Sequence, residues 1–121
     1  MLKDSLYHIV SSSAADGVIN AVIELQPDND IFQGHFPEQP VLPGACMLQM
    51  VKEILEGELH QSYQLQKAEN LKFLTMIDPN QNQTLYLELN HATDENATRV
   101  NASLSTNEQV AFKLQATFSV I

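Results

Sequence analysis

The sequence predicts an α+β fold in which an antiparallel β-sheet wraps around one central α-helix. Stretches with strand-like alternation lie at both ends of the chain, and one apolar helical segment lies between them. A proline-rich loop separates the first strands from this helix, and no repeat or linker divides the 121 residues. We therefore expect a single domain over residues 1–121.

The first two strands are expected at residues 7–12 and 18–25, because both segments are rich in β-branched or alternating residues. Asp16 and Gly17 between them are typical of a hairpin turn. Residues 26–43 contain prolines at four positions, so neither a helix nor a central strand can run through them. A loop of this length in a small domain is usually functional.

The helix is expected directly after Pro43 and Gly44, since residues 45–59 contain good helix formers and no proline. Its polar residues lie on one stripe of the helix, and apolar residues cover the remaining surface. The stripe consists of Gln49, Lys52, Glu53 and Glu56. Its charged side chains are expected at an exposed edge of the helix. Four further strands are expected at 64–73, 84–91, 97–105 and 110–120. The helix should therefore be mostly buried against a sheet of about six strands.

Composition excludes several classes of function. Six basic residues against 15 acidic ones give a net charge of −9, which argues against nucleic acid and anionic membrane as partners. No stretch approaches the roughly 20 apolar residues of a membrane span, and the N-terminal segment does not resemble an export signal. The single cysteine, Cys46, cannot form an internal disulfide, so a cytoplasmic location is expected.

No metal or cofactor is expected. His8, His60 and His91 share no metal-ligand spacing with each other or with acidic neighbours, and one cysteine cannot build a thiolate cage. A glycine-rich phosphate loop is also absent from the sequence.

The informative segment is IFQGHFPEQPVLPG, residues 31–44, which leads directly into the helix. His35 follows a glycine and precedes Phe-Pro, so it is expected on a rigid loop where an imidazole can act as a general base. Gly44 begins the helix, and its N–H lies at the positive end of the helix dipole, where it can bind a carbonyl oxygen that gains charge during enolisation. A purely structural role for the turn and for His35 is the alternative.

GHFPEQPVLPG resembles the GHFPxxPxxPG signature of β-hydroxyacyl-carrier-protein dehydratases of the FabA/FabZ type, and nearly the whole chain fits that family's plan. The resemblance implies a hot-dog fold, an oligomer built from dimers, and an acyl tunnel between subunits. It also implies that His35 takes the α-proton of a (3R)-3-hydroxyacyl thioester while Gly44 polarises the carbonyl. Residues expected to contribute to substrate binding are Phe32, Gly34, Phe36, Pro43, Met47 and Glu53.

Gln49 departs from this pattern, because the family has a Glu or Asp at this position on the helix, fourteen residues after the histidine. An amide can orient a hydroxyl group, but it has no proton to exchange near neutral pH, and general acid catalysis typically contributes about 10² to 10⁴-fold. Glu53 lies one turn further along the same stripe and would serve instead if the substrate lay about 6 Å deeper along the axis.

Three functions therefore remain open. The first is a dehydratase or hydratase of acyl-carrier-protein or coenzyme A thioesters. The second is a weakly active or non-catalytic acyl-binding subunit, for instance half of a heterodimer. The third is a hot-dog thioesterase that uses Glu53 to activate water. An acidic carrier protein also needs a basic docking patch, for which the chain offers only Lys3, Lys52, Lys67, Lys72, Arg99 and Lys113.

Overall fold

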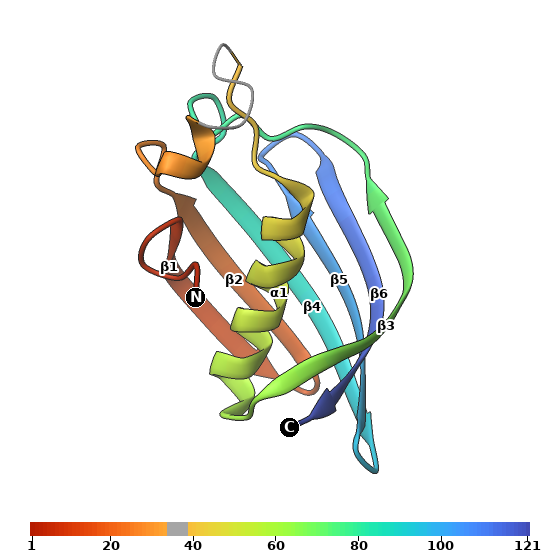
Figure 1. Ribbon diagram of the computed structural model, residues 1–121. Coiled ribbons are helices and arrows are strands. Elements are labelled where there is room, and N and C mark those ends of the chain that lie inside the picture. The colour runs from red at the N-terminus through yellow and green to blue at the C-terminus, as the bar shows by residue number, and fades with distance from the viewer. Residues whose placement is uncertain (34–38) are drawn as a thin grey trace.

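The computed structural model describes residues 1–33 and 39–121, in which one α-helix lies against a six-stranded antiparallel sheet (Figure 1). The strands are β1 (Tyr7–Ala15), β2 (Val18–Leu25), β3 (Tyr63–Phe73), β4 (Thr84–Asp94), β5 (Ala97–Ser105) and β6 (Val110–Val120). The helix α1 covers Gly44–Leu59, and a short 3₁₀ turn, η1, covers Asp30–Phe32. The expected α+β architecture is therefore confirmed.

The order of strands in the sheet is β1-β2-β4-β5-β6-β3. The first hairpin forms one edge, and β3, which follows the helix, pairs with the last strand to form the other edge. The chain thus passes from one half of the sheet to the other through α1, which covers the face between them (Figure 1).

The strand and helix boundaries agree with the sequence to within a few residues. β1 is longer than expected because its pairing continues to Ala15 opposite Val18, immediately before a turn in which Asp16 and Gly17 have positive φ. The helix continues through Gly57 and ends at His60, which takes the left-handed conformation typical of a helix C-terminus. None of the helices that the structure describes is long and apolar enough to cross a membrane.

The core lies between α1 and the inner face of the sheet. Alternation buries every second residue of β5 and of β4 as far as Leu89, and the apolar ones pack with Met50 and Ile54 of the helix. Each fully buried aliphatic side chain stabilises the fold by about 1.5–3 kcal/mol. The helix is consequently fixed in place over most of its length, and with it the residues at its start.

β3 differs from the other strands because most of its side chains are exposed. Its pairing with β6 shifts register at two places, between Leu65 and Lys67 and between Ala68 and Asn70. From its last residue onward the chain exposes Phe73, Leu74 and Met76, which makes this corner of the molecule unusually apolar for a surface.

Candidate functional site

The helix begins at a point where backbone N–H groups are available. Pro43 is extended, with φ −64° and ψ 145°, and its carbonyl accepts from the N–H groups of Cys46 and Met47 at 3.0 and 3.2 Å. The N–H of Gly44 belongs to the first turn, where an α-helix leaves its donors without intrahelical partners, and no residue in the described ranges accepts from it. This donor and the positive end of the dipole together favour a carbonyl oxygen or another electron-rich group.

A largely apolar pocket of about 520 Å³ opens beside this helix start. It is lined by Val41, Leu42, Pro43, Gly44, Met47, Phe73, Leu74, Thr75 and Met76. The pocket therefore combines apolar walls with the backbone of the first helical turn, which is the combination that binds an acyl chain attached to a carbonyl.

Gly44 is required for the close approach of the Phe73 ring. A Cβ atom built on Gly44 would lie 2.4 Å from Cε1 of Phe73, well inside van der Waals contact. Phe73 is 53% exposed and packs against Phe112 with ring centroids 5.3 Å apart. The ring therefore forms one wall of the pocket and leaves the other side open to a ligand.

Sequence reasoning did not assign Phe73, Leu74 or Met76 to the site. Phe73 was expected only as the last residue of the strand at 64–73. The available signal was the run of apolar residues continuing past the strand end, which an edge strand does not need for packing.

Glu53 lies on the other side of the helix and is 4% exposed. Its Oε1 accepts from Lys3 N and Tyr7 Oη, both at 2.9 Å, and its Oε2 accepts from Leu2 N at 2.8 Å and Gln49 Nε2 at 2.9 Å. The expectation of an exposed helix edge is therefore wrong for Glu53. A carboxylate buried among apolar residues requires such donors, and the N-terminal segment supplies them.

These contacts also determine the charge of the site. Burial alone would raise the pKa of Glu53, but the hydrogen bonds from Leu2, Gln49, Tyr7 and Lys3 outweigh it and hold the pKa below its usual value. Burial and the hydrogen bond to this carboxylate raise the pKa of Tyr7. Glu53 is therefore an ionised structural anchor, and neither of its oxygens is available to receive or supply a proton.

Gln49 lies between this anchor and the helix surface. Its Nε2 donates to Glu53, which confirms that the two side chains share one stripe, and the bond fixes the orientation of the amide. Gln49 lies five positions after Gly44, so the two residues are about 140° apart around the helix axis. One chain therefore does not bring Gln49 into the Gly44 pocket.

The remaining predicted residues fall into three groups. Pro43 and Met47 line the pocket with Gly44. Phe32 is 3% exposed and packs in the core, so it takes the structural role of an ordinary buried aromatic. Gly34, His35 and Phe36 lie outside the described residues.

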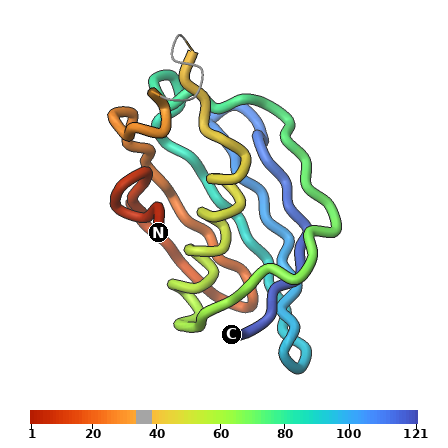
Figure 2. Tube along the Cα trace, in the orientation of Figure 1, coloured from red at the N-terminus to blue at the C-terminus, as the bar shows by residue number. Residues whose placement is uncertain are grey.

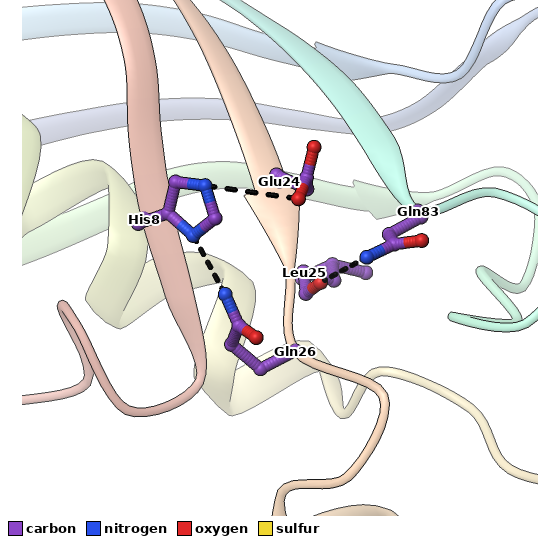
Figure 3. A network of polar contacts seen from close by, with 5 residues as sticks. All are labelled: His8, Glu24, Leu25, Gln26 and Gln83. Carbon is purple, nitrogen blue, oxygen red and sulfur yellow. Dashed lines mark hydrogen bonds and ion pairs between the residues drawn. The ribbon is translucent and has the colours of Figure 1, made fainter.

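His8 takes part in a polar network at the end of the first hairpin (Figure 3). Its Nε2 lies 3.7 Å from Glu24 Oε1, and its Nδ1 lies 2.6 Å from the side-chain amide of Gln26. Gln83 adds a bond to the carbonyl of Leu25 at 3.2 Å. This network ties the beginning of the loop segment to the hairpin and lies apart from the pocket residues, so we assign it a structural role.

Within residues 1–33 and 39–121, no group of three or more histidine, cysteine or acidic side chains is arranged to hold a metal ion. Cys46 is buried, and burial raises the pKa of its thiol, as expected for a core cysteine.

The sheet wrapped around a helix, with an apolar pocket at the helix start, defines a hot-dog protein. Residues 11–115 match the model of the ApeI-like family, described as ApeI dehydratase. The chain therefore belongs to the ApeI-like dehydratase family. The resemblance to the FabA/FabZ type is confirmed by a relative, the 3-hydroxyacyl-[acyl-carrier-protein] dehydratase FabZ of Levilactobacillus brevis. The two sequences are 30% identical over 100 residues, and the match covers 77% of this chain and 67% of the relative.

Solved structures give the same result. The dehydratase heterocomplex ApeI:P from Xenorhabdus doucetiae contains a chain that is 25% identical, with a TM-score of 0.75 over 92% of this chain and 96% of that one. A hypothetical thioesterase with coenzyme A from Streptococcus pneumoniae is 12% identical, with a TM-score of 0.69 over 95% and 85% of the two chains. The second similarity shows the shared fold alone.

Proposed function

We propose that this chain binds (3R)-3-hydroxyacyl thioesters of acyl carrier protein and supports their dehydration to trans-2-enoyl thioesters. The observation that carries the proposal is the apolar pocket at the start of α1, which Gly44 lines and where its N–H has no acceptor among the described residues. Its family and the named activity of the Levilactobacillus relative support this substrate class. A cytoplasmic location fits the free thiol of Cys46.

In this proposal the thioester carbonyl accepts a hydrogen bond from Gly44, and the acyl chain lies along Met47 and Phe73. The bond strengthens as the α-carbon loses its proton, because negative charge then moves to the carbonyl oxygen. A single donor of this kind is typically worth about 10² to 10³ in rate.

His35 is the proposed base. It takes the α-proton, the electron pair forms the new carbon–carbon double bond, and the β-hydroxyl leaves. Gln49 cannot supply the proton that converts this hydroxyl to water, and Glu53 is held ionised by four hydrogen bonds. The imidazolium of His35 therefore returns the abstracted proton to the leaving group, so that water and the enoyl thioester are the only products.

A second chain is required if Gln49 is to contact the same substrate as Gly44, because the two face different sides of the helix. We propose a dimer or a larger assembly of dimers, in which Gln49 of one subunit faces the pocket of the other and accepts a hydrogen bond from the substrate hydroxyl. Glu53 fixes the amide nitrogen of Gln49, which leaves the amide oxygen as the group presented to the substrate.

A heterodimeric arrangement is the second candidate. Two observations favour it: the amide at position 49, and the solved structural neighbour described as a dehydratase heterocomplex. In this arrangement a partner hot-dog chain supplies the missing carboxyl group, and this chain supplies the pocket.

The burial of Glu53 argues against a thioesterase. A carboxylate that activates water must have a free oxygen beside the thioester, whereas both oxygens of Glu53 are occupied by the N-terminal segment, Tyr7 and Gln49.

The test is turnover of the purified chain with 3-hydroxyacyl and crotonyl thioesters of acyl carrier protein, followed by the absorbance of the enoyl thioester. We expect slow interconversion that His35→Ala lowers by at least about 10²-fold. Interconversion that appears only after a complete dehydratase homologue is added identifies the heterodimer, whereas release of free thiol identifies a thioesterase. Absence of all three reactions over several chain lengths contradicts the proposal.

A further inference from the structure

The outer face of the sheet, which points away from α1, carries most of the positive charge of the protein. Four of its six basic residues, Lys67, Lys72, Arg99 and Lys113, lie on β3, β5 and β6, where pairing places them on this face. We name these four residues the outer basic face. Among the described residues, Glu69 and Glu88 line the two hollows on this face, and the register places Glu24 and Asp94 further along the same face. Two basic and eleven acidic residues remain elsewhere in the chain.

The register of the strands arranges this face in three rows. One row runs from Lys72 through Lys113 and Ser103 to Glu88, and another joins Lys67, Thr117 and Arg99. Neighbouring rows are separated by two residues along β5 and β6, or about 7 Å. Two rows of cations therefore lie on either side of a central row.

The central row consists of amides, namely Asn70, Gln115, Asn101 and Asn90. Within the described part of the chain, none of these four side chains forms a hydrogen bond, and none of the four cations forms an ion pair. A hollow of about 390 Å³ covers the row of Lys72 and Lys113, and an adjoining hollow of about 440 Å³ covers Arg99; the two share Asn101 and Gln115.

The cost of this arrangement suggests a ligand. Lys72 and Lys113 are direct cross-strand partners, and like charges in that position destabilise a sheet. An acidic partner would relieve the repulsion and bind the unpaired amides. The positive potential of this face would also guide the partner, because the protein as a whole has a charge of −9.

The outer basic face also meets the pocket. Lys72 and Phe73 are neighbours on β3, and successive side chains of a strand point to opposite faces. Lys72 thus points to the outer face, whereas Phe73 packs over Gly44 at the pocket. A partner bound to the outer face is therefore close to the place where a thioester would enter the pocket. Only the end of the edge strand β3 separates the two.

We propose that the outer basic face docks the acidic surface of the acyl carrier protein that delivers the thioester. This inference rests on the proposed function, because it identifies the carrier rather than coenzyme A as the bearer of the acyl group. The carrier protein would bind a surface of the sheet that is remote from the helix. Its docking would therefore be separate from the chemistry in the pocket.

The experiment measures binding of phosphopantetheinylated acyl carrier protein by calorimetry at about 0.1 M salt, where surface charges interact over about 10 Å. Arg99→Glu combined with Lys113→Glu removes two cations from the interior strands β5 and β6, away from the sheet edges. The matched control combines Lys3→Glu with Lys52→Glu, which changes the net charge equally but lies outside the outer basic face. We expect the first variant to weaken binding at least tenfold and the control less than twofold.

The same variants separate docking from catalysis. With a carrier-protein substrate, Arg99→Glu/Lys113→Glu should raise KM and leave kcat unchanged, and with the corresponding coenzyme A thioester it should change neither. Should the chain turn nothing over, either alone or with a complete dehydratase homologue, the proposed function fails, but the calorimetry still decides the docking site.

Three results would overturn the inference: no binding by the wild-type chain, equal weakening in both double variants, or no weakening in either. A fourth is self-association through this face, seen as a larger oligomer that Arg99→Glu/Lys113→Glu breaks apart.

Discussion

The two sides of helix α1 are built in opposite ways. Near Gly44 the helix faces an open apolar pocket, and the N–H groups of Gly44 and Ala45 lack acceptors among the residues that the structure describes. Near Glu53 the helix is joined to Leu2, Lys3 and Tyr7 by three hydrogen bonds, and no described buried side-chain polar atom is left unpaired. Figure 2 shows the N-terminal segment, in red, on one side of the helix and the end of β3, in green, on the other.

This difference separates binding from stability. The open side has polar backbone groups that are satisfied only when a ligand is present, which is typical of a site. The closed side has a charged group whose partners are all internal, which is typical of a structural anchor. The residue that the sequence suggested as a substitute acid, Glu53, belongs to the anchor.

The largest expected effect is on the closed side. Glu53→Leu removes the acceptor for Leu2, Lys3, Tyr7 and Gln49, and should lower the free energy of unfolding by about 3 kcal/mol because buried donors are left unpaired. The matched variant Glu53→Gln keeps one carbonyl oxygen and should cost about 1 kcal/mol. Urea denaturation measures both, and a loss below about 0.5 kcal/mol for Glu53→Leu would disprove the anchor.

Gln49→Glu tests whether the anchor can support an acid. The new carboxyl would lie beside the Glu53 carboxylate, and the repulsion raises its pKa toward the range useful for proton transfer. We expect the dehydration rate to rise at least tenfold. Combining Gln49→Glu with Glu53→Gln removes the repulsion between the two carboxylates. The pH optimum of the reaction should then move to lower pH. An unchanged rate in both variants would show that position 49 does not face the substrate.

Gly44→Ala sharpens the account of the open side. The added methyl group displaces the Phe73 ring and narrows the pocket, so KM should rise several-fold, with little change in the free energy of unfolding because the ring is half-exposed. Phe73→Ala combined with Gly44→Ala should restore part of the loss by removing the clash. An increase in KM that persists unchanged in the double variant would place the acyl group elsewhere.

The smallest effect is on the pH dependence of stability. Because hydrogen bonds hold the pKa of folded Glu53 below that of the unfolded chain, its contribution is present above the ordinary Glu value of about 4.3 and is lost as pH falls through the folded pKa. Wild-type stability should therefore decline more steeply on acidification than that of Glu53→Gln. Parallel curves from pH 6 to pH 3 would show that the carboxylate is not stabilised.

Much of the fold could be predicted from the sequence because its signals are local. Alternation in residues 84–91 and 97–105, a turn at Asp16 and Gly17, and prolines up to Pro43 each determine a short segment by themselves. The start of the helix and the role of Gly44 as its first residue follow from the same local reasoning.

Three of the four partners of Glu53 could not be predicted, because they come from residues 46 to 51 positions away in the chain. Nothing in the helical periodicity indicates that the backbone of Leu2 and Lys3 returns to cover a polar stripe. The role of Phe73 in the pocket was not predicted for a related reason. Its contact with Gly44 depends on how the end of β3 passes the helix. Long-range packing, which local pattern does not encode, decided which residues face a ligand.

The most direct test of the central claim is the amide spectrum of ¹⁵N-labelled protein titrated with a non-hydrolysable 3-hydroxyacyl pantetheine analogue. If the start of α1 binds the thioester carbonyl, the resonances of Gly44 and Met47 should shift strongly and saturate together, while those of Leu2 and Lys3 at the Glu53 anchor remain in place. Saturable binding that leaves Gly44 unshifted would contradict the account.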